Sequence, residues 1–556
     1  MRPEESEGRG TGDGSPAGAT PDDPLGMSRR HVLGGILAAG AVAGGLGGLA
    51  ARHRSGHADA EDVRRPPARA AARRPNPAET AIGGGAFIQD ENARPGTPGW
   101  TIPDGNVRPR GIEGFIDRTS AERGDTVWLY ARTAAPSFTV TAYRTGYYGG
   151  VGARRIWSSA TVRARSQPHP VVHPATRTVD CAHWRPSLAI DIDDAWPPGQ
   201  YLLRLEPAAG SASYVPLIVR DDSRASDIVV ISDVTTVQAY NTWGGFSLYG
   251  DEIGDPARRA TMVSFDRPYG NSWAQVGSII GDTFNVGMQL ESMGLDVGYI
   301  TNVDEHQRPD LLPRHRLIVS GAHDEYYSLE MRTGLEAARA RGVNIVFLGA
   351  NAVFRRIRFA PSPLGPDRRQ INYRSARADP LDGIDDRRVT TNWRDDPDPR
   401  PEWSLTGTYY ESNQAGLTAP MVIVDPGAWM FEGTGVTRGT RWPGLVREEY
   451  DRVTPGAPTP KRIQVLTHSP LVCRGKASYS DMAYYTVPSG AAVLDVGTLR
   501  FEPHLGPLGP RGGRLPRQTD PQIRRFMANV FTALSRGPAG RTHPAEPNLD
   551  RLGITR

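Results

Sequence analysis

The residues best able to do chemistry stand in one short run, His323-Asp324-Glu325, where three titratable side chains follow one another. The apolar residues 317–319 just before them predict a buried strand. In an open α/β sheet, ligands bind at the carboxyl ends of the strands. Burying such groups there is costly unless they hold a metal, a proton or a substrate. The run therefore predicts a functional site.

Two further clusters carry polar groups at comparable places. Residues 238–245 read Gln-Ala-Tyr-Asn-Thr-Trp-Gly-Gly and follow 228–232, an apolar run that predicts the first strand of the same sheet. Residues 263–269 end in a tyrosine, Tyr269, after a turn proline. Because the carboxyl ends of parallel strands meet at one edge, Tyr240 is expected to lie near the first run.

Each of these side chains also has an ordinary structural explanation. Most tyrosines are half-buried aromatics, which would account for Tyr240 and Tyr269. His323 is also consistent with a core histidine that has found its hydrogen-bond partners, and Asp324 with a loop cap or a partner of Arg332. Their combined placement at the ends of adjacent strands favours the functional interpretation.

A helix is expected directly after the first run. Ser328 is a good N-cap residue, and an acidic residue, Glu330, would lie in the first turn. One apolar stripe would then face the core, formed by Met331, Leu335 and Ala338.

Strands and helices alternate around this unit. Helical spacing covers 284–293, and short apolar runs at 297–300 and 343–348 predict strands. This alternation over 221–540 is typical of a parallel, doubly wound α/β sheet. Shorter β runs follow, and a final amphipathic helix is expected to pack on the sheet; these segments are 462–466, 491–496 and 521–534.

The preceding part of the chain has a different period. Short alternating runs with β-branched and aromatic residues lie between Gly/Pro turns, at 126–131, 138–143, 188–192, 201–205 and 214–219. Residues 86–220 are therefore predicted to form a β-sandwich of immunoglobulin-like size. The expected fold is α/β plus all-β.

The start of the chain predicts export. Paired arginines, Arg29-Arg30, precede a Gly/Ala-rich apolar run at 32–51, and small residues at 58–60 suit a cleavage site. Residues 1–60 are predicted to be a twin-arginine signal peptide, although a membrane anchor is the alternative. Residues 61–85 predict a linker, and 541–556 a tail. A periplasmic or extracellular protein without a stable membrane span after cleavage is expected.

Composition excludes several function classes. The formal net charge is +4 over 556 residues and the arginines are spread along the chain, which gives no nucleic-acid footprint. Only two cysteines, Cys181 and Cys473, are present. They are too few for a metal-thiolate site, and both a disulfide and two buried thiols fit an exported protein.

Several motifs, taken in order, resemble one family. They are residues 143–150, 238–245, 264–269, 323–328 and 349–352, with a weaker match at 489–493. Together they resemble the large (beta) subunit of N,N-dimethylformamidase from about residue 86 to 534. The resemblance implies an α/β domain similar to glutamine-amidotransferase-like folds and an amidohydrolase acting on the C–N bond of a small-molecule amide.

The resemblance also implies a mononuclear iron held by two tyrosines and one glutamate. Carried onto this sequence, the glutamate is Glu325 and one tyrosine is Tyr240. The second tyrosine is assigned to Tyr269, with Tyr201 as the alternative. Phenolate and carboxylate are hard oxygen ligands that suit Fe³⁺. A homo-oligomer and a separate small subunit are both left open.

Roles for the neighbouring side chains follow from the chemistry of amide cleavage. His323 would act as a base or protonate the departing amine. Asn241 would hydrogen-bond the developing oxyanion, and Asp324 would orient His323.

Two other function classes remain in view. In a non-catalytic exported binding protein, Trp243, Tyr249 and Trp273 would form a platform for a glycan or a cell-envelope component. A nucleophile-and-triad hydrolase is disfavoured, because the strand-to-helix elbow holds Ala322-His323 and the sequence contains no Gly-x-Ser-x-Gly motif.

Overall fold

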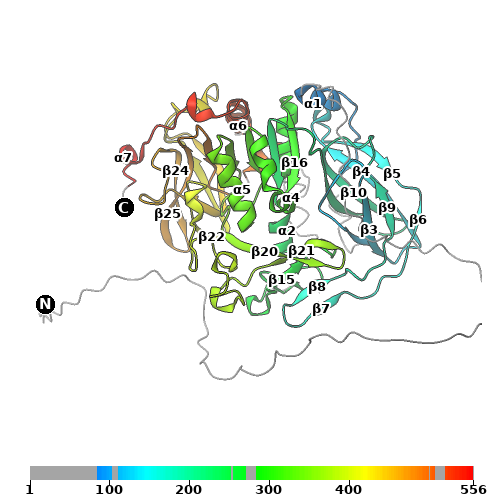
Figure 1. Ribbon diagram of the computed structural model, residues 1–556. Coiled ribbons are helices and arrows are strands. Elements are labelled where there is room, and N and C mark those ends of the chain that lie inside the picture. The colour runs from blue at the N-terminus through cyan, green and yellow to red at the C-terminus, as the bar shows by residue number, and fades with distance from the viewer. Residues whose placement is uncertain are drawn as a thin grey trace, which may run out of the picture. The chain divides into compact units, whose positions relative to one another are not determined.

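The computed structural model describes residues 84–102, 111–251, 254–270, 283–499, 501–506 and 520–554. These all belong to one compact unit, Ala70–Arg556, with a mixed α/β fold of several sheets and few helices (Figure 1). The predicted signal peptide and nearly all of the predicted linker lie outside the described residues. No helix among the described residues is both long and apolar enough to cross a membrane.

The first part of the unit holds two β-sheets. One has the order β1-β3-β9, namely Ile112–Ile116, Thr126–Thr133 and Leu188–Asp191. The other has the order β2-β11-β10-β4-β5, with β6 paired to β4, namely Ser120–Glu122, Ser213–Arg220, Gly199–Pro207, Ser137–Thr145, Ala153–Ser158 and Val162–Arg163. All five strands predicted in this region are present. The two sheets share one buried core that includes Leu129, Val140 and Leu203.

Two details of this region differ from the sequence-based expectation. The helix α1, Gly84–Asn92, comes before the first strand, where alternating β runs were expected from residue 86. A small hairpin, β7 (Val171–His173) and β8 (Thr178–Asp180), extends from the sheets. Cys181 follows β8 and is a buried free thiol, as is Cys473, so no disulfide links them.

A seven-stranded sheet forms the centre of the second part. Its order is β16-β12-β17-β19-β26-β25-β24, namely Val297–Thr301, Ile228–Ser232, Leu317–Ser320, Asn344–Phe347, Ala492–Asp495, Lys476–Thr486 and Ile463–Cys473. Neighbouring strands from β16 to β26 are parallel. The last two strands run antiparallel. The predicted parallel sheet is confirmed, and the late β runs extend it.

Both faces of this sheet are covered. One face packs against α3 (Phe284–Ser292), α6 (Asp520–Leu534) and the hairpin β22–β23 (Tyr409–Val422 and Arg441–Arg452). The other packs against α5 (Leu329–Ala340), through Met331, Leu335 and Ala338 as predicted. Strands buried on both faces have continuous apolar sequences, which is why they were recognised.

Smaller elements surround the carboxyl edge of the sheet. The helices α2 (Val234–Tyr240) and α4 (Asn302–Gln307) follow β12 and β16. A four-stranded sheet has the order β15-β21-β20-β18, namely Met262–Ser264, Gly365–Ile371, Arg355–Ser362 and Tyr326–Ser328. The hairpin β13–β14 joins Phe246–Ser247 to Gly250–Asp251, and α7 (Leu549–Leu552) lies within the predicted tail.

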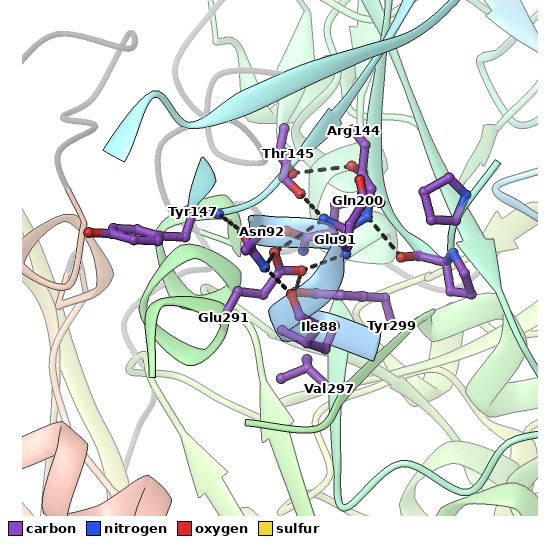
Figure 2. Close-up of polar contacts among 12 residues, drawn as sticks. Ile88, Glu91, Asn92, Arg144, Thr145, Tyr147, Gln200, Glu291, Val297 and Tyr299 are labelled. Atoms are coloured by element: carbon purple, nitrogen blue, oxygen red, sulfur yellow. Dashed lines mark hydrogen bonds and ion pairs between the residues drawn. The ribbon is translucent and has the colours of Figure 1, made fainter. Parts of the chain in front are cut away.

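The two parts meet in a buried polar network (Figure 2). Arg144 of β4 donates to both carboxylate oxygens of Glu291 in α3, at 2.7 and 3.1 Å, and both side chains are fully buried. Tyr299 of β16 donates to the same carboxylate at 2.8 Å, and Asn92 of α1 donates to it at 2.9 Å. A buried arginine and glutamate thus neutralise each other between the sandwich sheet and the helix that covers the α/β sheet.

Candidate functional site

Three side-chain oxygen atoms, two from tyrosines and one from a glutamate, converge at the carboxyl edge of the central sheet. The hydroxyl of Tyr249 donates to Glu325 Oε2 at 2.6 Å, and that of Tyr240 donates to the same oxygen at 3.3 Å. The two phenol rings are stacked with centroids 4.0 Å apart. Glu325 is 1% exposed, whereas both tyrosines reach partly to the surface. One carboxylate oxygen therefore faces two phenol oxygens.

The backbone around Glu325 is fixed from several sides. Its N–H donates to Thr236 Oγ1 at 3.0 Å, and its carbonyl accepts from the N–H groups of Phe354 and Arg355 at 3.0 and 2.8 Å. The side chain of Arg355 also contacts Glu325 Oε1 at 3.2 Å. With Oε1 held by the guanidinium, Oε2 is left to face Tyr240 and Tyr249.

A buried arginine holds the segment that carries the tyrosines. Arg267 donates to the carbonyls of Trp243, Phe246 and Asn241 at 3.1, 2.8 and 2.8 Å. Burial lowers its pKa to about 10, which still leaves the guanidinium charged at neutral pH. It holds a turn between α2, which ends at Tyr240, and the β13–β14 hairpin, whose turn contains Tyr249.

His323 lies beside this oxygen cluster. Its Nε2 is 3.4 Å from Glu449 Oε2 and 3.8 Å from Glu325 Oε2, and its ring centroid is 5.7 Å from that of Tyr240. Burial lowers the pKa of His323, but Glu449 and then Glu325 outweigh this effect and raise it to about 9. Glu449 also accepts from Asn351 Nδ2 at 2.8 Å. The imidazole therefore lies between two carboxylates, which favours its charged form.

Asp324 points away from His323, because adjacent residues in extended chain face opposite sides. Its carboxylate accepts from Tyr327, Ser320 and Asn302 at 2.5, 2.8 and 3.2 Å. Burial raises its pKa to about 6. In this structure Asp324 braces the end of β17 rather than the imidazole.

Asn241 holds the tyrosine segment in shape. Its Nδ2 donates to Gln238 Oε1 at 3.1 Å and to the carbonyl of Pro268 at 2.9 Å. Its Oδ1 accepts from the N–H groups of Trp243 and Gly270 at 3.1 and 2.9 Å. These contacts occupy both N–H groups of a fully buried amide, which favours a positioning role over the expected oxyanion contact.

The structure places Tyr249, not Tyr269, beside Tyr240 and Glu325. After Pro268 the chain turns toward the sandwich, and the Tyr269 ring is buried in an apolar cluster that includes Trp100, Tyr143 and Phe284. The alternative residue, Tyr201, lies in the sandwich core and donates to the carbonyl of Pro197 at 2.6 Å.

Four residues of the site were not assigned to it from the sequence. Tyr249 was considered only for a glycan platform. Asn351 lies in the motif 349–352 but was given no role there, and Glu449 and Arg355 come from later segments without a motif of their own. Tyr249 follows Tyr240 by nine residues, across a hairpin too short to show a strand period. The only available signal was the repetition of tyrosines after the first strand.

The aromatic residues of the alternative binding platform have structural partners. Trp243 Nε1 donates to Glu113 Oε2 at 2.8 Å, and its ring lies edge-on to Trp184 with centroids 6.1 Å apart. Tyr249 is committed to Glu325, and Trp273 lies outside the described residues. Trp243 therefore joins the site segment to the sandwich.

Comparison with known proteins identifies the family. Residues 139–514 match the family described as N,N-dimethylformamidase beta subunit-like, C-terminal. The chain belongs to this family. A search of curated proteins returned no match. The matched region begins within β4 of the sandwich and includes every residue of the oxygen cluster, so this dimethylformamidase beta subunit-like region contains the whole candidate site.

The donors of this dimethylformamidase-like site fit a hard cation. Among the described residues, no group of three or more His, Cys, Asp and Glu side chains is arranged to hold a metal ion. Burial and then Glu325 raise the pKa values of Tyr240 and Tyr249 well above the usual range. A trivalent cation would reverse this effect, because two phenolates and one carboxylate balance its charge.

Proposed function

We propose that the protein is an amidohydrolase that cleaves the C–N bond of a small amide, like N,N-dimethylformamidase, with an iron ion held by Tyr240, Tyr249 and Glu325. The observation that carries this proposal is the convergence of two phenol oxygens on one buried carboxylate oxygen. The family membership supports the reaction class. The ion, when bound, supplies a Lewis acid that polarises the amide carbonyl and acidifies water.

The chain's own residues supply the proton transfers and the orientation. Amide cleavage requires the departing nitrogen to be protonated, and we assign that proton to His323, whose Nε2 lies 3.8 Å from Glu325 Oε2. Glu449 stabilises the charged imidazole at 3.4 Å, and Asn351 holds Glu449. Arg355 donates a hydrogen bond to Glu325 Oε1, so that the carboxylate keeps one orientation through the reaction.

The remaining parts of the proposal concern the fold relationships and the location. The two sheets of residues 112–220 suit an immunoglobulin-like sandwich, and the sheet β16 to β24 suits an amidotransferase-like domain. The Arg29-Arg30 motif supports export through the twin-arginine pathway to the periplasm or the exterior. A small polar amide met outside the cytoplasm is the proposed substrate.

Metal analysis with a visible spectrum tests the proposal. The exported form is loaded with iron, and its iron content is measured in the wild type and in Tyr240→Phe, Tyr249→Phe and Glu325→Gln. We expect about one iron per chain with a phenolate-to-iron charge-transfer band in the wild type, and loss of the band or the metal in each variant. Hydrolysis of a panel of formamides and acetamides is then measured with the loaded protein.

Tyr269→Phe is the matched control, because it removes a buried phenol from the same part of the chain that does not contact Glu325. It should keep the iron and the band. A folded wild-type protein that stays colourless and free of iron after loading would contradict the proposal. Loss of iron in Tyr269→Phe with retention in Tyr249→Phe would contradict the ligand assignment.

A further inference from the structure

The Tyr249 oxygen has a second phenol as a hydrogen-bond partner. Tyr249 accepts a hydrogen bond from the hydroxyl of Tyr326, with the two oxygens 2.9 Å apart. Tyr326 is fully buried in β18, immediately after Glu325 in the sequence. The Tyr249 oxygen is therefore in contact with a second phenol as well as with Glu325.

An arginine on another strand connection completes this arrangement. Arg374 follows β21, and its Nη2 donates to the hydroxyl oxygen of Tyr326 at 3.0 Å. Its guanidinium carbon also lies 4.0 Å from the centroid of the Tyr249 ring. Arg374 thus contacts the face of the Tyr249 ring directly, and it is also linked to the Tyr249 oxygen by hydrogen bonds that pass through Tyr326.

The direction of these hydrogen bonds is fixed by chemistry. A guanidinium only donates, so the Tyr326 oxygen acts as acceptor toward Arg374 and its single hydrogen is given to Tyr249. Hydrogen bonds in such a chain polarise one another, and a charged donor at its start strengthens the next bond. The positive charge of Arg374 is in this way transmitted to the Tyr249 oxygen.

We propose that Arg374 and Tyr326 are positioning residues that tune Tyr249: they hold a donated hydrogen on its oxygen and make that oxygen a weaker electron donor than it would be without them. The inference rests on the proposed iron site, whose ligands include both tyrosines. Partners that donate to a metal ligand commonly set the electronic properties of a site, and here they act on one ligand of a chemically identical pair.

The proposal predicts a change in the visible absorption spectrum of the iron-loaded protein. A hydrogen bond and a nearby positive charge lower the energy of the phenolate electrons, which raises the energy of their transfer to iron. Removing either should move the Tyr249 part of the charge-transfer band to longer wavelength while the metal stays bound. A residue that merely supports the fold would change the amount of loaded protein and not the position of the band.

The experiment compares four iron-loaded variants with the wild type. Arg374→Met removes the charge and keeps an aliphatic stem on the Tyr249 ring. Tyr326→Phe removes the donated hydrogen and leaves every formal charge in place. Arg374→Lys keeps the charge and should restore much of the wild-type position. Arg377→Gln, at an exposed position three residues away, is the control for losing one positive charge from the same segment.

We expect both Arg374→Met and Tyr326→Phe to shift the band to longer wavelength, with Arg377→Gln unchanged. A wild-type band in iron-loaded Tyr326→Phe overturns the inference. Loss of iron from both variants while Arg377→Gln stays loaded also overturns it, because a tuning partner changes a ligand and does not create one. A colourless wild-type protein removes the proposed function and this inference with it, whereas coloured variants with unmoved bands remove the inference alone.

Discussion

At the scale of single residues, the site is organised around one carboxylate oxygen. Glu325 Oε2 faces Tyr240, Tyr249 and His323, whereas Oε1 is occupied by Arg355. In a buried environment such a set is stable only when its charges are balanced. Within the described residues, Arg355 supplies a positive charge beside the carboxylate, and the guanidinium of Arg374 lies 4.0 Å from the centroid of the Tyr249 ring.

Glu449→Gln tests the role assigned to the pair of His323 and Glu449. The amide cannot stabilise a charged imidazole, so we expect the rate of amide hydrolysis to fall by about 10²- to 10⁴-fold, the usual contribution of a positioned acid or base. The iron content should remain that of the wild type, since Glu449 is not one of the proposed ligands. Steady-state kinetics with a hydrolysed amide, together with metal analysis, measures both.

Glu411→Gln is the control for this prediction. Glu411 lies on β22, the strand paired with that of Glu449, and pairs with Arg452, whose side chain is 41% exposed. The substitution should leave the rate unchanged. Full activity in Glu449→Gln would show that His323 does not need this carboxylate.

Three residues of this cluster, Tyr240, His323 and Glu325, were predicted from the sequence to lie together. They come after apolar runs that predict strands, and the ends of such strands form the binding edge. Glu449 and Arg355 belong to long irregular strands of the second half of the chain, where the hydrophobic period is weak. Their approach to Glu325 depends on tertiary packing, which no local pattern records.

At the scale of elements, the helix that follows the site strand is held by its cap. Ser328 Oγ accepts from the N–H of Met331 at 3.2 Å and contacts His306 Nδ1 at 2.8 Å. Ser328→Ala should lower the free energy of unfolding by about 1 kcal/mol, the usual value of an N-cap. Urea unfolding followed by circular dichroism measures the change.

Ser375→Ala is the matched control, because Ser375 precedes a short 3₁₀ turn and makes no cap hydrogen bond with its side chain. It should change the free energy of unfolding by less than about 0.5 kcal/mol. Equal effects of the two substitutions would contradict the assignment of Ser328 as a cap that stabilises α5.

The first turn of the same helix predicts a pH dependence. The contact with His306, whose Nδ1 lies 3.4 Å from Oε2, lowers the pKa of Glu330 to about 2, and Arg388 adds to this effect against the opposing effect of burial. Because the folded pKa lies below that of the unfolded chain, the ionised carboxylate stabilises the protein above about pH 4.5. This contribution is lost as the pH falls toward 2.

Glu330→Gln should remove that contribution. The difference in unfolding free energy between wild type and variant should be largest at neutral pH and should shrink steadily as the pH falls from 4.5 to 2. Urea titrations at several pH values measure it. A difference that is constant over this range would show that Glu330 acts through packing rather than through its charge.

Elements were predictable where the period was clear. The strands β12, β16, β17 and β19 and the helix α5 were expected at nearly their observed positions, because apolar runs and one apolar stripe mark them. The order of the sheet beyond β19 was not predictable. β24, β25 and β26 join the same sheet from more than a hundred residues later, and their place depends on pairing that leaves no local trace.

At the scale of the whole described molecule, the sandwich and the α/β part belong to one compact unit. Polar contacts join them at several places: Ser120 to Asp304 at 2.6 Å, which is buried, and Trp243 to Glu113 at 2.8 Å and Arg369 to Asp180 at 2.7 Å, which are partly buried. The hydrogen bond from Trp243 to Glu113 ties the segment between Tyr240 and Tyr249 to the sandwich. The sandwich therefore helps to set the geometry of the site.

The pair of Arg144 and Glu291 is the strongest test of this coupling. Its charges are fully buried between the two parts, so removing one leaves the other without compensation (Figure 2). Glu291→Gln should lower the free energy of unfolding by about 3–5 kcal/mol, whereas Arg123→Gln, at an exposed ion pair, should cost less than about 1 kcal/mol.

Because the pair of Arg144 and Glu291 belongs to both parts, tryptophan fluorescence and circular dichroism of Glu291→Gln should report one shared transition at a lower urea midpoint. Two separate transitions, with the sandwich at its wild-type midpoint, would show instead that the parts fold independently and that the buried pair only holds them in register.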